Sequence, residues 1–188
     1  MARILRRRFR HDETGSLSIE AVFALPILVW AIVATFVFWD AFKTLNISQK
    51  ATYTVADMLS RETDPIDGDY IAAMHEMFDF LAGSAGANAI RVTVVTKVSD
   101  PNSGAEEVQL VWSEGAGVAP YSDLALIESR LPEMAVGEQL IVVESEQEWQ
   151  PDFAVGLAAY RFREVALARP RFTPQLIWDD GLGSGAAS

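Results

Sequence analysis

An uncharged run over residues 21–39 dominates the hydropathy pattern, and only one proline and one threonine interrupt its apolar and aromatic side chains. A helix rises about 1.5 Å per residue, so this run spans roughly 28 Å, close to the hydrocarbon thickness of a bilayer. Apolar residues then recur at helical spacing at Ala51, Val55 and Leu59. The pattern predicts one long helix over about residues 17–61, whose first half crosses a membrane and whose second half continues as a spine.

The helical pattern breaks at the turn cluster TDPIDGDY, residues 63–70. Its three aspartates suit either a calcium site or a capped turn, and the spacing lacks the alternate carboxylates and later glutamate of an EF-hand loop. A capped turn is therefore favoured. A second helix is predicted over residues 70–81. Its apolar face comprises Ile71, Met74, Met77, Phe78 and Leu81.

The remaining chain is rich in β-branched residues and in alternating polar and apolar positions, which predict strands. The linker AGSAGAN precedes them, DPNSG forms a hairpin turn between the first two, and SDLALIESRL reads as a short helix or a turn. Two prolines end the last strand. The predicted strands cover residues 89–98, 106–112, 138–149 and 160–172. Helices on one face of a small antiparallel sheet give an α+β fold.

Charge is distributed unevenly along the 188 residues, which carry 26 acidic and 15 basic side chains and a net charge of -11. Five arginines fall within the first ten residues, and the rest of the chain is acidic. This balance argues against a nucleic-acid partner, because phosphate contacts need clustered basic side chains. The positive-inside rule places the arginine-rich end in the cytoplasm and the predicted α+β domain on the far side of the membrane.

Candidate chemistry is sparse. The chain has no cysteine, which excludes disulfides, thiolate nucleophiles and cysteine-based zinc sites. His11 lies in the basic arm, and His75 lies on the second predicted helix without a neighbouring histidine at metal-binding spacing. A lone helical histidine is usually structural, and no local nucleophile and base signature occurs. We expect no enzymatic activity, no metal and no cofactor.

A cleaved secretory signal peptide is the simplest alternative to a membrane anchor, since it also joins a basic region to an apolar one. Its apolar core is shorter, however, and ends at small residues. Here the run ends in FVFWDAFK, whose bulky aromatics suit a membrane interface better than a cleavage site. A cut after the run is therefore disfavoured.

The stretch TGSLSIEAVFALPILVW offers a different cut site, before the apolar run. It resembles a prepilin (class III) signal, in which a basic leader ends in glycine and the fifth mature residue is glutamate. The resemblance implies that a prepilin peptidase cuts after Gly15, that Ser16 becomes the new N-terminus, and that Glu20 is the glutamate of the motif. Ser16 differs from the phenylalanine that begins many mature type IV pilins.

A narrower resemblance follows from the same stretch together with VVESEQEW and VALARPRF. These segments are similar to the opening and closing parts of TadE-like proteins of the tight-adherence (Tad, or Flp) pilus system. The resemblance implies a minor pilin or pseudopilin held in the bacterial inner membrane with a periplasmic domain, whose partners are the peptidase, other pilin-like subunits and the lipid bilayer. The resemblance gives a cleaved leader over residues 1–15. The sequence pattern divides the rest into a membrane and spine helix, an α+β domain and a flexible tail, over residues 16–62, 63–180 and 181–188.

Glu20 and Pro26 each have two possible roles. Glu20 either pairs with the N-terminal amine of a neighbouring subunit or favours its own helix N-terminus at the membrane interface. Pro26 introduces either a kink that matters for bundling or an ordinary kink of a membrane helix. A single-span sensor or adhesin would show a similar anchor and domain, but it has no need of a peptidase site before its anchor.

Overall fold

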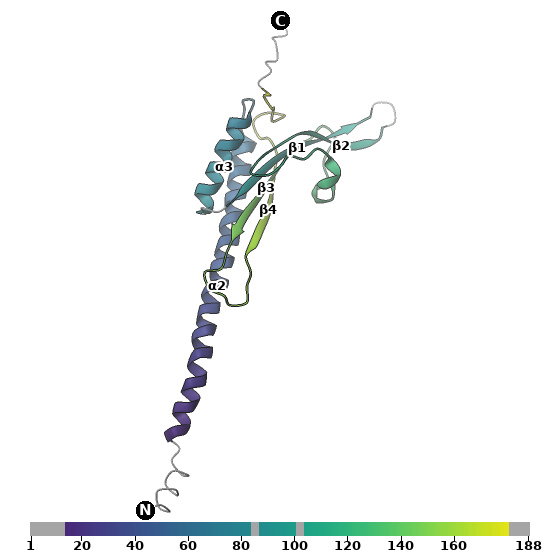
Figure 1. Cartoon of the computed structure of the whole chain (residues 1–188). Coiled ribbons are helices and arrows are strands. Elements are labelled where there is room, and N and C mark those ends of the chain that lie inside the picture. The colour runs from purple at the N-terminus through teal and green to yellow at the C-terminus, as the bar shows by residue number, and fades with distance from the viewer. Residues whose placement is uncertain (1–13, 84–86, 101–103, 181–188) are drawn as a thin grey trace, which may run out of the picture. The chain divides into compact units, whose positions relative to one another are not determined.

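The computed structural model describes residues 14–83, 87–100 and 104–180. The first thirteen residues of the predicted leader, with His11, and the predicted tail over 181–188 lie outside these residues. In chain order the elements are α2 (Thr14–Arg61), α3 (Gly68–Ala82), β1 (Ala89–Ser99), β2 (Glu106–Ala116), the 3-10 helices η1 (Leu124–Leu126) and η2 (Glu128–Arg130), β3 (Gln139–Trp149) and β4 (Tyr160–Ala168) (Figure 1).

The chain divides into two compact units. Unit 1 contains α2 up to Phe42 together with Pro151–Ala158, the loop between β3 and β4. Unit 2 contains Lys43–Gln150 and the described residues from Ala159 onward. Unit 2 thus begins well before residue 63, where the sequence pattern sets the start of the α+β domain, because side chains in the last turns of α2 belong to its core.

The sheet of unit 2 has four strands in the order β2-β1-β3-β4, and every neighbouring pair is antiparallel. The predicted hairpin of the first two strands is confirmed. Val94 pairs with Trp112 and Val95 with Leu110, so Val111 is the extra residue of a β-bulge. The α+β class predicted from the sequence is confirmed.

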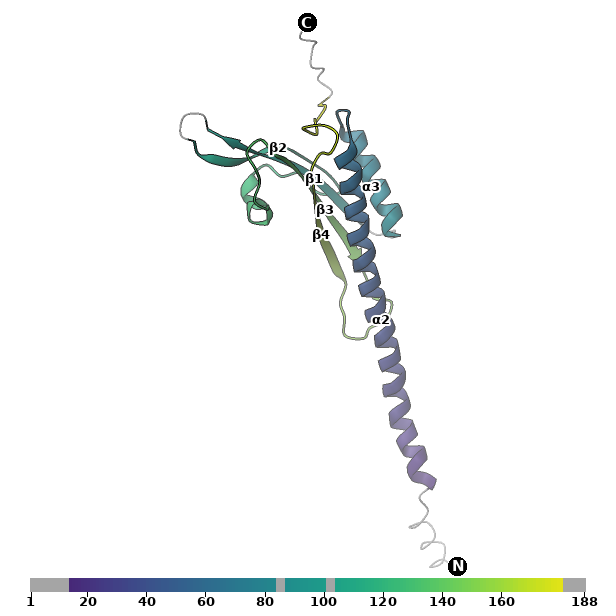
Figure 2. The same ribbon diagram turned by 180° about the vertical axis from the view of Figure 1, so that it is seen from behind.

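One face of the sheet packs against α3 and the last turns of α2, which lie on the same side of the sheet in Figures 1 and 2. Side chains alternate across a strand, so every second residue of β1 and β3 reaches this core. The buried core comprises Ala51, Val55, Ala56, Leu59, Ile66, Ile71, Met74, Phe78, Ala82, Ile90, Val92, Val94, Ile141, Val143, Ala166 and Leu176. Met77 and Leu81, predicted on the apolar face of α3, are half-buried.

Both ends of α3 are fixed by local chemistry. The Asp67 carboxylate accepts a hydrogen bond of 2.9 Å from the backbone amide of Tyr70, which satisfies one of the free donors of the first turn. Gly83 ends the helix in the left-handed conformation, with φ of 63°. The capped turn predicted at the aspartate cluster is therefore confirmed, and α3 begins two residues earlier than the pattern indicates.

The opposite face of the sheet carries a second, smaller core that the sequence pattern does not predict. Residues 117–138, which include η1 and η2, supply Ile127 and Met134 to it. The sheet contributes Val95, Leu140 and Val142. The segment SDLALIESRL, predicted as a short helix or a turn, therefore packs on part of this face.

Candidate functional site

The residues of the predicted processing and assembly site lie in the first turns of α2. Gly15 and Ser16 belong to the opening turn, and Glu20 follows as an exposed residue. Pro26 lies inside the helix, which continues on both sides of it. The structure thus brings these four residues onto one continuous helix, and their roles in cleavage, pairing and kinking stay predictions.

The apolar side chains of α2 within unit 1 are mostly exposed. A stretch of α2 is long and apolar enough to cross a membrane, and 11% of its most apolar window is buried. A core helix of a soluble domain would be mostly buried. The exposed large side chains are Ile19, Val22, Phe23, Leu25, Ile27, Leu28, Val29, Trp30, Ile32, Phe36, Phe38, Trp39 and Phe42.

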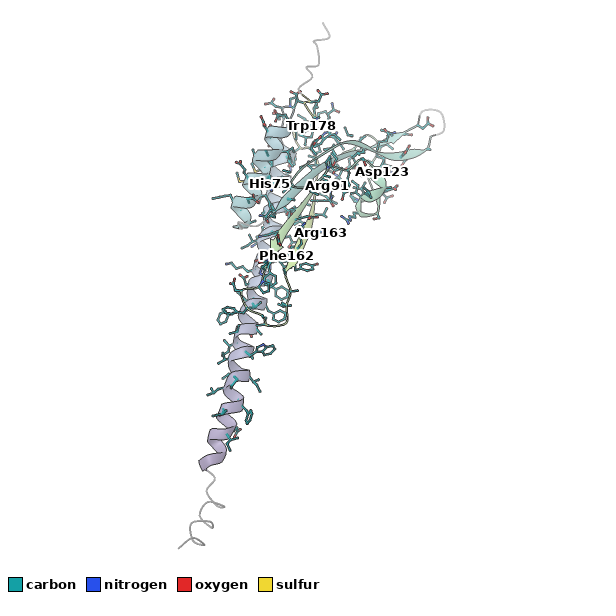
Figure 3. The ribbon with its side chains drawn as sticks, viewed as in Figure 1. His75, Arg91, Asp123, Phe162, Arg163 and Trp178 are labelled. Carbon is teal, nitrogen blue, oxygen red and sulfur yellow. The ribbon has the colours of Figure 1, made fainter. Side chains whose placement is uncertain are left out.

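A buried ion pair lies on the same face of the sheet as the second, smaller core. Arg91 on β1 donates to the Glu144 carboxylate on β3 through Nε at 2.9 Å and Nη2 at 2.7 Å. The two side chains are 14% and 10% exposed. Figure 3 labels Arg91 on the sheet and Asp123, whose carboxylate caps η1. Charges as buried as these need well-formed partners.

Residues 117–131 complete the coordination of this pair. Arg91 donates to the Ala119 carbonyl at 3.1 Å and to the Tyr121 hydroxyl, and its guanidinium lies 3.5 Å from the centre of the Tyr121 ring. Tyr121 in turn donates to Oε1 of Glu144 at 3.2 Å, and Arg130 donates to the same oxygen at 2.8 Å, whereas Arg91 binds Oε2. One carboxylate therefore ties the covering segment to two strands.

Burial raises the pKa of the Tyr121 hydroxyl, and the hydrogen bond to Glu144 raises it further, while Arg91 and Arg130 offset part of the effect. A cavity of about 230 Å³ adjoins the network and is lined in part by Glu146 and Arg163. Arg163 pairs with Glu146 at 3.0 Å, so these charges also satisfy one another. The cluster of Arg91, Tyr121, Arg130 and Glu144, which we call the clamp, therefore links the sheet to residues 117–131.

A second polar cluster joins α2 to β3. Thr52 and Ser145 are buried and their hydroxyl oxygens lie 2.6 Å apart, a hydrogen bond across the interface. Ser48, four residues before Thr52, and Gln147, two residues after Ser145, are also buried. Their side-chain oxygens lack a hydrogen-bond partner among the described residues. Polar contacts of this kind fix the register of a helix on a sheet, because a slip leaves the groups unsatisfied.

His75 lies on α3, where its Nε2 is 3.0 Å from the Asn88 carbonyl. The Asn88 side chain donates to Asp79 at 2.7 Å, so the histidine and the aspartate join α3 to the chain entering β1. This placement agrees with a structural histidine. In the ranges that the structure describes, no three His, Asp or Glu side chains come together as a metal site.

Sequence reasoning missed the clamp formed by Arg91, Tyr121, Arg130 and Glu144. Its members are far apart in the chain, and 53 positions separate Arg91 from Glu144. One signal was present: Glu144 interrupts the apolar run LIVVE in a strand whose neighbours are buried. A charge inside such a strand predicts a buried partner.

No family model, curated protein or solved structure matches this chain.

Proposed function

We propose that the chain is a non-enzymatic, membrane-anchored pilin-like subunit of the TadE type. It is made with a basic cytoplasmic leader, cut after Gly15 by a prepilin peptidase, and held in the bacterial inner membrane by α2 with its α+β domain in the periplasm. In this proposal it assembles with other pilin-like subunits of a Tad or Flp pilus machinery, which it supports instead of forming its bulk.

The observation that carries the proposal is the position of Gly15 and Glu20 directly before the exposed apolar stretch of α2. A membrane anchor alone requires neither residue. Glycine has no side chain, so another chain can approach its backbone closely. The carboxylate at the membrane boundary is expensive unless something compensates for its charge.

The continuity of α2 adds support. The helix is 48 residues long and joins the apolar stretch to the core of unit 2 without a break. A helix that is anchored in lipid at one end and shared with a folded domain at the other is what a pilin-like subunit needs. A bitopic sensor or adhesin shares this feature, so cleavage before the anchor separates the two functions.

The processing step is tested by expressing the full chain with a prepilin peptidase and following its electrophoretic mobility. Gly15→Leu should block the shift to the shorter form while the chain still enters the membrane, because the arginine leader and the apolar run are unchanged. Ser18→Leu introduces the same side chain three residues later and should be cut normally. Normal cleavage of Gly15→Leu would contradict the assigned cut site, and a complete lack of cleavage of the unaltered chain would favour the sensor or adhesin.

The role of Glu20 is tested by Glu20→Gln, which removes the charge and nearly preserves the shape. Cleavage and insertion should persist, whereas crosslinking to other pilin-like subunits should fall, because opposite charges attract strongly in a low-dielectric bundle. Asp40→Asn is a matched control at the other end of the apolar run. Undiminished crosslinking of the Gln variant at normal protein level would leave Glu20 as an interfacial charge only.

A further inference from the structure

The loop between β3 and β4 forms a compact unit with the apolar part of α2. Residues 151–158 read PDFAVGLA and contain one charged side chain, Asp152. They belong to unit 1 together with α2 up to Phe42, and the loop lies beside α2 in both Figures 1 and 2. The loop is therefore an apolar segment held against a helix that is itself long and apolar enough to cross a membrane.

Burial along the helix indicates the level at which the loop meets α2. Ala34 and Val37 are 8% and 4% exposed, whereas the large side chains around them are mostly exposed. Val155 of the loop is buried as well. Ala34 and Val37 lie in the last turns of the uncharged run, which ends at Trp39. At about 1.5 Å per residue, Ala34 is roughly 8 Å below that end.

We propose that the β3–β4 loop is a second membrane contact, which inserts Phe153 into the interfacial region of the outer leaflet beside α2. The proposal rests on the membrane anchoring of α2 proposed above. A segment fixed at this level of a membrane-spanning helix lies within the depth of about 5–10 Å to which interfacial segments sink into the boundary of headgroups and acyl chains.

The chemistry of the loop suits this region. Phe153 is large, apolar and exposed, so transferring its side chain from water to the acyl boundary is favourable. The Val155 amide donates to the Phe153 carbonyl at 3.0 Å, which forms a tight turn. The polar backbone of an irregular turn is tolerated among water and headgroups but not in contact with the hydrocarbon core. The loop therefore fits the interface and not the centre of the bilayer. Lipid is the favoured partner because it occupies this level wherever α2 spans the membrane.

The test uses single cysteines in the full chain, which has no cysteine of its own. Val29, Phe153 and Leu126 are 57%, 59% and 60% exposed, so labels at these positions start from matched accessibility. Val29→Cys reports the middle of the apolar run, and Leu126→Cys reports η1 in unit 2. Each variant carries an environment-sensitive nitrobenzoxadiazole label in vesicles of phosphatidylcholine and phosphatidylglycerol, with lipids that bear a doxyl quencher at a shallow or a deep position.

We expect the Phe153→Cys label to emit at shorter wavelength and to lose most of its emission to the shallow quencher. The Val29→Cys label should respond best to the deep quencher and the Leu126→Cys label to neither. A quenched Val29 label with an unquenched Phe153 label overturns the second contact and leaves the anchor intact. An unshielded Val29 label overturns the anchor and the loop contact together.

Two further outcomes also count against the proposal. A Phe153 label that shifts to shorter wavelength without lipid quenching contacts protein, such as a neighbouring subunit, and not lipid. A Leu126 label quenched as strongly as the Phe153 label shows that the label enters the bilayer wherever it is attached.

Discussion

Replacing Glu144 by alanine removes the common partner of Arg91, Tyr121 and Arg130 and leaves the Arg91 guanidinium buried without a carboxylate. Breaking a buried ion pair on one side costs about 3–5 kcal/mol. Arg91 keeps its contacts with the Ala119 carbonyl and the Tyr121 ring, which places the loss near the lower end. We expect a decrease in the free energy of unfolding of about 3 kcal/mol.

The matched control is Glu146→Ala, two residues along the same strand. Glu146 is 20% exposed and pairs with Arg161 and Arg163, whose side chains are 50% and 71% exposed. Because water reaches both arginines, these pairs contribute about 0–1 kcal/mol. Urea unfolding of a fragment over residues 43–180, followed by tryptophan fluorescence, measures both variants. For a domain of this size, 3 kcal/mol corresponds to a melting temperature lower by about 10 °C. Equal losses for the two variants would refute the argument from burial.

Three further changes test the core and the perturbed groups of unit 2. Phe78→Ala should lower the free energy of unfolding of the same fragment by about 3–5 kcal/mol, because Phe78 is fully buried between α3 and the sheet; a loss below about 1 kcal/mol would contradict this packing. Burial and the 2.8 Å hydrogen bond to Glu62 raise the pKa of Tyr70 above its unfolded value of about 10. The neutral hydroxyl therefore contributes fully to the stability of the fold below about pH 10, and this contribution is lost as pH rises above that value. The urea midpoint should therefore fall with rising pH above about pH 10, and less so in Tyr70→Phe. Burial raises the pKa of Glu164, which disfavours its charged form, so Glu164→Gln should raise the urea midpoint at neutral pH, with a gain that shrinks as pH falls through the raised pKa.

The strands, α3 and the turn before it could be predicted because their signals are local. Ile90, Val92 and Val94 are separated by the polar residues Arg91 and Thr93 on β1, and Asp67 lies at capping distance in sequence from Tyr70. Strand ends were less accurate: β4 stops at Ala168, two residues before Pro170, whereas the pattern extends it to residue 172. Local chemistry therefore fixes the elements, and their ends depend on pairing partners.

The clamp and the second small core could not be predicted because their partners meet only in the folded sheet. Ile127 and Met134 lie in two short apolar runs, LALI and MAV, that do not alternate regularly. Their burial depends on Val142, which lies on a strand that follows them in the chain and faces away from the helices. Arg91 reads in sequence as an exposed strand residue until Glu144 is placed on the neighbouring strand. The membrane contact proposed for the loop at Phe153 could not be predicted either, because it depends on the position of the loop beside α2.

The N-terminus of the mature chain, purified from membranes of cells that contain a prepilin peptidase, tests the proposed function most directly. N-terminal sequencing and intact mass should both show a chain that begins at Ser16 and retains α2. A chain that begins at Met1, or beyond Trp39, would contradict the assignment as a processed pilin-like subunit.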